Sequence, residues 1–549
     1  MKKRTKKLLT LCVRCRRVRD STVESLLLLF FRKEGLSYFF AYCFLAALTI
    51  APIFAVDNLG LGDYLNHLAR MHILASIATS PELQRFYQVA WAPIPYLAMD
   101  AVVPLLAHVL PIYLAGKVFV AGCMLLPVVG TACVHYAVHR RLSLIPAASF
   151  LCSANFLLSL GFLNYLFSVA FALLLFAAWI ATAAWPRWPR AAAFAPCVVA
   201  LYFGHAFACG AYCLCVAGWE VAVAWGVRFR PRQRVAADFA AAFAQAVPAL
   251  GFAFTLRVSA GYVGALNTQY GNIAAKLMAL ISPEMFFVDR LNALVLVASL
   301  AAVVSVWRNI RIAPALWPAI AVLAAAAIAM PHVLASTWGM DLRLPWVVAL
   351  LLVAGASFVS PAAGSLRAWR LAALGCLTVL LAAKSADAWV VLSRVDRQIA
   401  QTREVLAALP RGARLLVVNP AGHGTGWERE PLSTIWHMPL VAVIDRDAFV
   451  PTLFNGLTTV HVRPAFRLSS TPNGLPITPA QLWEGLSRAD SPGAETGDGF
   501  GARLYHFDWP QKFDFVLVQR FGFDPPPLPG NLVLVGHAPD MDLYRVKHG

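Results

Sequence analysis

The chain has 549 residues, of which 59% are apolar and only 13% carry a charge. Globular proteins average about 25% charged residues, so no soluble fold of this size could bury so much apolar surface. The composition therefore excludes soluble, disordered and coiled-coil proteins and predicts a chain that crosses a membrane many times. Membrane topology explains the net charge of +18 better than nucleic-acid binding does, and the eleven cysteines form no disulfide framework.

A basic tail over residues 1–34 holds eleven Lys and Arg residues, and apolar runs with short polar connectors fill residues 35–388. A membrane-spanning helix needs about 20 apolar residues. Eleven spans are predicted on this basis, at 36–56, 113–138, 143–160, 162–185, 191–206, 208–226, 238–256, 291–307, 313–330, 345–361 and 369–387.

Two of these boundaries follow from length alone. As single helices the runs 143–185 and 191–226 would be about 64 Å and about 54 Å long, twice what a bilayer core needs, so each is expected to turn back. The predicted turns are near Gly161 and Gly204. The segment 94–112 contains three prolines together with Asp100 and His108, which predicts a helix at the membrane surface rather than a span.

Lys and Arg are distributed unequally between the connectors. The tail and the connectors on its side hold 23 of them, and the opposite connectors hold eight. Basic residues are retained on the cytoplasmic side, so the N-terminus is predicted to be cytoplasmic, in a bacterial-type plasma (inner) membrane. An odd number of spans then places the C-terminal region on the exoplasmic, periplasmic side.

Residues 389–549 have a different composition, in which acids balance bases and Pro and Gly are frequent. They predict a soluble domain with an amphipathic helix at 394–409, a Pro/Gly/Ser-rich loop near 464–503, and strands at 413–418, 441–444, 513–519, 532–535 and 543–546. The predicted fold is thus an all-α polytopic membrane bundle of about eleven transmembrane helices with a C-terminal exoplasmic α/β domain.

The first exoplasmic connector, residues 57–112, is the richest in polar side chains. If a helix begins at Asp63, His67 and Arg70 follow it on neighbouring turns, close to the membrane surface. A carboxylate in this position can deprotonate a hydroxyl group while the arginine holds a phosphate. A helix cap and an interface arginine are the alternative roles of Asp63 and Arg70.

The segment Asp63-Tyr-Leu-Asn-His-Leu-Ala-Arg70 resembles the first exoplasmic loop of the GT-C class of integral-membrane glycosyltransferases. These enzymes take sugars from polyprenyl phosphates, and an acidic residue of this loop is the candidate base. The resemblance implies that Asp63 is the catalytic base, with Asp57 as the second candidate. It also implies an activity of the mannosyl- or arabinosyltransferase kind. Tyr64 stands where a second acid often lies, so the chain departs from a two-carboxylate metal site; no cofactor is certain, although a divalent metal is compatible with the class.

Further polar residues are predicted on the same side of the membrane. Asn164 and His205 fall at predicted exoplasmic turns, and Trp338, Asp341 and Arg343 follow the ninth span. Arginine suits a phosphate, tryptophan a sugar face and aspartate the sugar hydroxyls, whereas a structural Asp341–Arg343 ion pair is the alternative. With His67 and Arg70, these are the predicted substrate-binding residues, and no metal ligands are assigned.

Three functions are compatible with the sequence. The first is a glycosyltransferase that uses a polyprenyl-phosphate sugar donor and an envelope glycan, lipid or protein acceptor, with an O-antigen ligase or polymerase as a variant. The second is a transporter, which needs ionisable residues at mid-membrane, where few are found. The third is a non-catalytic membrane protein that presents its exoplasmic domain. Membrane lipid is a partner in each case, and nucleic acid in none.

Overall fold

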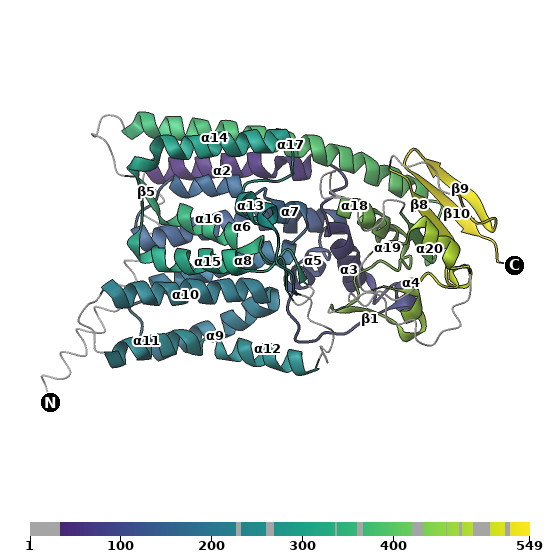
Figure 1. Cartoon of the computed structure of the whole chain (residues 1–549), viewed down its shortest axis with the longest axis horizontal. Helices are drawn as coiled ribbons and strands as arrows, with labels where there is room; N and C mark the ends of the chain where they lie inside the picture. The colour runs from purple at the N-terminus through teal and green to yellow at the C-terminus, as the bar shows by residue number, and fades with distance from the viewer. Residues whose placement is uncertain are drawn as a thin grey trace, which may run out of the picture.

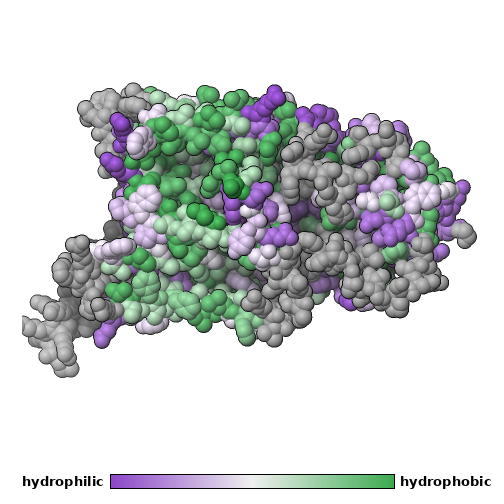
Figure 2. All heavy atoms as spheres, viewed as in Figure 1, coloured by the Kyte–Doolittle hydropathy of each residue, from purple (hydrophilic) through white to green (hydrophobic). Residues whose placement is uncertain are grey.

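The computed structural model describes residues 33–226, 232–259, 268–334, 337–358, 366–419, 432–456, 458–471, 475–486, 505–521 and 527–548. Figure 1 shows a bundle of roughly parallel helices with a smaller domain at one end, where the C-terminus lies. Up to residue 32 the predicted basic tail lies outside the described residues. Apolar side chains cover the flank of the bundle, and hydrophilic ones gather at its ends and on the smaller domain (Figure 2).

Within the described ranges, six helices are long and apolar enough to cross a membrane, so the chain is an integral membrane protein. They are α2 (Lys33–Phe54), α6 (Ile112–His139), α8 (Leu163–Ala181), α10 (Ala206–Gly226), α14 (Arg290–Val306) and α17 (Leu366–Leu406). The bent pair α11 (Arg232–Ala244) and α12 (Val247–Ser259) makes a seventh span if it counts as one.

The predicted number of eleven spans is not confirmed. The other four predicted spans are helices that fall short of the length or apolarity required for a crossing. They are the pair η1 (Ile145–Cys152) and α7 (Phe156–Ser159), then α9 (Arg187–Gly204), α15 (Trp317–Ala329, after η3 at Pro314–Leu316) and α16 (Arg343–Gly355). Each predicted apolar run therefore has a helical counterpart, but length in the sequence overstates the length of several helices.

Both predicted reversals of the chain are present. Gly161, between α7 and α8, has φ +83°, a left-handed conformation that favours glycine. A Cβ atom there would lie 2.6 Å from the backbone nitrogen of Asp63, so this turn also fits closely against the first connector. Gly204 ends α9, and α10 begins at Ala206. In the segment 94–112 the helix α5 (Ala98–Leu106) has nine residues and does not cross, in agreement with the sequence.

The two ends of the bundle differ in what they carry. The first connector contributes α3 (Tyr64–Ser76), α4 (Pro81–Phe86), β1 (Tyr87–Val89) and α5 at the end that bears the C-terminal domain (Figure 1). At the opposite end β2 (Ile310–Ile312), which follows η2 (Trp307–Asn309), pairs with β5 (Ala356–Phe358). This separation agrees with the predicted alternation of the connectors, and the cytoplasmic assignment of the second end stays a prediction.

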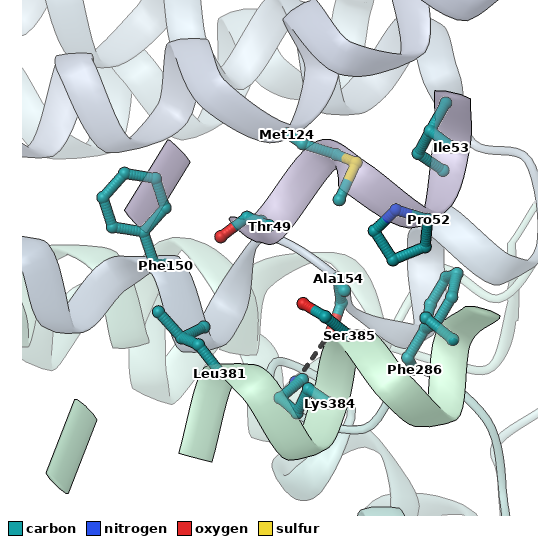
Figure 3. A pocket seen from close by; sticks show the side chains of 11 residues that line it. Thr49, Pro52, Ile53, Met124, Phe150, Ala154, Phe286, Leu381, Lys384 and Ser385 are labelled. Atoms are coloured by element: carbon teal, nitrogen blue, oxygen red, sulfur yellow. Dashed lines mark hydrogen bonds between the residues drawn. The ribbon is translucent and has the colours of Figure 1, made fainter. Parts of the chain in front are cut away.

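The longest helix, α17, joins the bundle to the C-terminal domain without a break over 41 residues. The predicted separate helices at 369–387 and 394–409 are therefore wrong, because the residues between them include no glycine or proline to interrupt the helix. Within the bundle Lys384 fixes α17 by donating to the carbonyl oxygens of Leu151 (2.7 Å), Ala154 (3.0 Å) and Glu284. Figure 3 shows Lys384 beside a small hollow between α2 and α17.

The C-terminal domain is built on a four-stranded sheet in the order β6-β8-β10-β9. Strand β6 (Leu415–Val418) is parallel to β8 (Phe515–Gln519), and β10 (Met541–Val546) is antiparallel to both β8 and β9 (Leu532–Ala538). Four of the five predicted strands are confirmed. The fifth, 441–444, is wrong: these residues begin the helix α19 (Val441–Arg446), since a short, fully buried apolar run suits either structure.

Shorter helices cover this sheet and interrupt the predicted loop at 464–503. They are α18 (Leu432–His437), η4 (Met438–Leu440), η5 (Pro464–Ser469), α20 (Pro479–Glu484) and α22 (Trp509–Lys512). Residues 472–474 and 487–503 of that loop lie outside the described residues.

The first connector and the C-terminal domain form one structural unit. Strand β1 pairs antiparallel with β7 (Val460–Val462), which puts a strand of the first connector beside one from the far end of the sequence. Helix α3 packs against α18 and α19, and Phe86 stacks its ring among those of Phe449 and Phe466. The site predicted on the first connector is consequently roofed by the C-terminal domain.

Candidate active site

Asp63 stands at the start of α3, but its side chain makes no capping hydrogen bond with the helix. Its position is fixed by the backbone instead, since its N–H donates to the carbonyl oxygen of Leu160 (3.0 Å). The carboxylate is 29% exposed, and its Oδ1 lies 3.3 Å from Nε2 of His437 in the C-terminal domain. A carboxylate that does not cap its helix and retains access to solvent is available for chemistry.

Arg70, two turns further along α3, is buried together with its partner Asp100 of α5. Its Nη2 lies 2.6 Å from Asp100 Oδ1, which also accepts from the hydroxyl of Thr459 at 2.6 Å. The charge of Arg70 is therefore already compensated by a carboxylate that the sequence analysis assigned only to a surface helix. Arg70 Nε and Asp100 Oδ2 remain without hydrogen-bond partners among the described residues.

His67 is held by the same arginine. Arg70 Nη1 lies 3.3 Å from His67 Nδ1, and because a guanidinium only donates, Nδ1 accepts and the neutral ring carries its proton on Nε2. Burial and then the Arg70 cation lower the pKa of His67 to about 4. His67 is thus a neutral hydrogen-bond donor at neutral pH, positioned by the chain Asp100–Arg70–His67.

A cavity of about 250 Å³ opens beside these residues. Its wall combines three parts of the chain: the first connector, the start of α8, and the loop after α19 in the C-terminal domain. The lining residues are His67, Arg70, Ile94, Pro95, Tyr96, Leu97, Asn164, Phe454, Gly456 and Thr458. Of the predicted residues, His67, Arg70 and Asn164 meet here, and the Oδ1 of Asn164 also accepts from the backbone N–H of Met99 (2.7 Å).

Arg343 lies at the start of α16, is only 6% exposed, and forms no ion pair with any described residue. Its guanidinium carbon lies 4.8 Å from the ring centroid of Phe162 and 5.7 Å from that of Phe207. One Nη contacts the sulfur of Met340, and Nε has no partner among the described residues. A buried cation without a carboxylate is costly unless an anion arrives to compensate it.

Asp341 does not pair with Arg343, although the sequence left a structural pair between them open. Its buried carboxylate lies 2.9 Å from His332 Nδ1 and 3.3 Å from Lys276 Nζ, which is carried by α13 (Ile273–Ile281). Trp338, on β4 (Thr337–Trp338), lies edge-on to His332 with the ring centroids 4.9 Å apart; β4 forms a hairpin with β3 (Val333–Leu334). Asp341 therefore organises this loop and leaves Arg343 uncompensated.

The turn at residues 160–165 joins the two groups. On one side Leu160 binds the backbone of Asp63, and on the other Phe162 lies over Arg343. His205 sits between Tyr96 of the cavity wall and Tyr165, at centroid distances of 4.7 Å and 5.2 Å, and the Tyr165 hydroxyl donates to the carbonyl oxygen of Arg343 (2.8 Å). Asp63, Asn164, His205 and Arg343 are thus all within one or two contacts of the same short turn.

Asp57, the second candidate base, lies at the end of α2 and is exposed. Its backbone N–H donates to Asp396 of α17 (3.1 Å), and it is not among the residues that line the cavity. Among the described residues, no group of three or more His, Cys, Asp and Glu side chains is arranged to hold a metal ion.

Sequence reasoning missed the residues that the C-terminal domain contributes, chiefly His437, Phe454 and Thr459. No local pattern marks them, because each gains its role only from contact with α3 or α5. Asp100 was noticed only as a polar residue in an apolar segment, which was the one signal that could have indicated its buried pairing.

Comparison with known proteins adds little to this geometry. No protein-family model and no curated protein matches the chain. Among solved structures, the chain is similar to the mycobacterial arabinofuranosyltransferase AftD, at 15% identity and a TM-score of 0.46. The match covers 92% of this chain, which spans 41% of the length of that one. Similarity at this level carries no argument, so the function is argued from the site.

Proposed function

We propose that this chain is a membrane glycosyltransferase that moves a sugar from a polyprenyl-phosphate donor to an envelope glycan, lipid or protein acceptor on the exoplasmic face. The observation that carries the proposal is Arg343, a buried guanidinium without an acidic partner among the described residues. A phosphate group delivered from the membrane would compensate its charge.

The remaining parts of the site support a sugar-transfer reaction around that phosphate. The cavity of about 250 Å³ is smaller than typical pockets for drug-sized ligands, about 300–1,000 Å³, and suits a single sugar ring. His67 and Asn164 offer hydrogen bonds to its hydroxyls. In the reaction the acceptor oxygen attacks C1 of the sugar, its proton passes to the Asp63 carboxylate, and the bond from C1 to the phosphate oxygen breaks.

Arg343 then stabilises the phosphate that leaves, because negative charge grows on its oxygens as the bond to C1 breaks. Arg70 contributes less charge of its own, since Asp100 compensates it, and its role in the proposal is to orient His67. Asp341, with Lys276 and His332, holds the loop that carries Arg343.

The donor class is tested with the purified full-length chain. We expect transfer of label to an acceptor from undecaprenyl-phosphate mannose or undecaprenyl-phosphate arabinofuranose, each supplied separately with membrane extract as the acceptor source. GDP-mannose is the matched control and is expected to give none. Transfer from the nucleotide sugar alone, or from none of the three, would contradict the proposal.

The side of the membrane is tested by reporter fusions after Gly549. We expect a periplasm-only reporter such as alkaline phosphatase to be active there, because 23 basic residues lie on the side of the N-terminus against eight on the other. A cytoplasm-only reporter at the same position is expected to be silent. The reverse result would move the site to the cytoplasmic face, where nucleotide sugars are present.

A further inference from the structure

The carboxylate proposed as the base is in contact with a histidine from the other end of the sequence. His437 is the last residue of α18 and is 3% exposed. Its Nε2 lies 3.3 Å from Asp63 Oδ1, and its ring packs edge-on against Phe454, at a centroid distance of 5.2 Å. His437 does not line the cavity, so any effect on catalysis acts through Asp63.

The protonation of this histidine follows from the hydrogen bonds of Asn66, which lies one turn after Asp63 on α3. Asn66 Oδ1 accepts from the backbone N–H of Phe454 (2.8 Å), which fixes which end of the amide is oxygen. Its Nδ2 donates to the carbonyl oxygen of Thr452 (2.9 Å) and faces His437 Nδ1 at 3.1 Å. Because the amide nitrogen only donates, His437 Nδ1 accepts, and the neutral ring carries its proton on Nε2.

We propose that His437 is a positioning residue for Asp63 in the reaction proposed above, on which this inference rests. Its Nε2–H donates to Asp63 Oδ1 and turns the carboxylate so that Oδ2 faces the acceptor. Oδ2 takes the proton of the acceptor hydroxyl as the new bond to C1 forms, while His437 keeps its own proton. Hydrogen bonds at catalytic groups are often long without substrate and shorten in the complex, which accommodates the distance of 3.3 Å.

A consequence is that the C-terminal domain controls the orientation of the base. The backbone of residues 452–454 holds Asn66, Asn66 sets the tautomer of His437, and His437 holds Asp63. The same loop supplies Phe454 to the cavity wall. The domain is therefore a working part of the site, with one chain of hydrogen bonds leading from it to the reacting oxygen.

The first test compares two amides at position 437. His437→Gln places an N–H group near the position of Nε2, whereas His437→Asn reaches only as far as Nδ1. We expect kcat to fall about 10- to 100-fold in His437→Asn, the usual range for partners that orient a functional group, and to stay within about threefold of wild type in His437→Gln. The KM for the donor, which Arg343 binds, is expected to be unchanged in both.

The second test reverses the tautomer. Asn66→Asp keeps the acceptor for Phe454 but replaces the amide donor by a carboxylate, so the proton of His437 moves to Nδ1 and is lost from Nε2. We expect a fall in kcat similar to that of His437→Asn. In the His437→Gln background the same change should cost much less, because no tautomer remains to be reversed; the double variant thereby separates this effect from the added negative charge.

The outcomes distinguish this inference from the function on which it rests. Transfer is measured with the active polyprenyl-phosphate sugar of the donor assay, and the amount and thermal stability of each variant are measured in parallel. If Asp63→Asn abolishes transfer but His437→Asn and His437→Gln are equally active, or equally impaired, the positioning role is wrong and the proposed function stands. If the wild-type chain transfers no sugar from either donor, the proposed function fails first.

Discussion

Asp63→Asn is expected to abolish sugar transfer while the chain remains folded and inserted. The change removes the carboxylate that accepts the proton of the acceptor hydroxyl, and loss of a general base typically lowers the rate by about 10² to 10⁴. Folding should be little affected, because the Asp63 side chain caps nothing and Asn still accepts from His437. We expect the stability to change by less than about 1 kcal/mol, the usual worth of a cap. The measurement is transfer from the active polyprenyl-phosphate sugar, with expression and thermal stability checked in the same samples.

Asp57→Asn is the matched comparison. Asp57 is exposed at the end of α2 and does not line the cavity, so this variant should keep most of the activity. Full activity in Asp63→Asn together with a large loss in Asp57→Asn would transfer the role of base to Asp57. Full activity when both are replaced would rule out the proposed mechanism.

Arg343→Met is expected to lower transfer by at least about 100-fold and to leave the chain as stable as before or more stable. Removing one donor to a developing negative charge costs about 10² to 10³ in kcat. The guanidinium lies between Phe162 and Phe207 and forms no ion pair with described residues, so a methionine of similar length leaves no carboxylate uncompensated. Replacing a buried charge by an apolar side chain is often neutral or stabilising. Transfer assays and thermal unfolding of the purified protein measure the two effects.

Two other arginines provide the contrast. Arg70→Gln should reduce stability by about 3–5 kcal/mol, because it leaves Asp100 buried without its partner. Arg308→Gln, an exposed position at the opposite end of the bundle, should change neither quantity. If Arg343→Met unfolds the chain as Arg70→Gln does, Arg343 has a structural role and the phosphate site must lie elsewhere.

The sequence by itself determined the features that depend on local composition. The apolar content identified a membrane protein, and the two over-long runs located the turns at Gly161 and Gly204, because a helix that exceeds the bilayer must reverse. The change in composition near residue 390 marked the C-terminal domain, and four of its strands followed from short runs rich in Val, Leu and aromatic residues. Asp63 and Arg343 were likewise noticed because a charge beside a membrane span is costly to place.

Only the tertiary structure decided which charges compensate one another. Local spacing gave no warning that Arg70 pairs with Asp100, that Asp341 pairs with Lys276 and His332, or that Arg343 is consequently left without a carboxylate. Each pair joins residues from different elements, and the interaction between charges depends on distance and burial, which local spacing does not contain. The same reason hid His437: it lies more than 370 residues from Asn66, and only the packing of α18 against α3 brings its imidazole to Asp63.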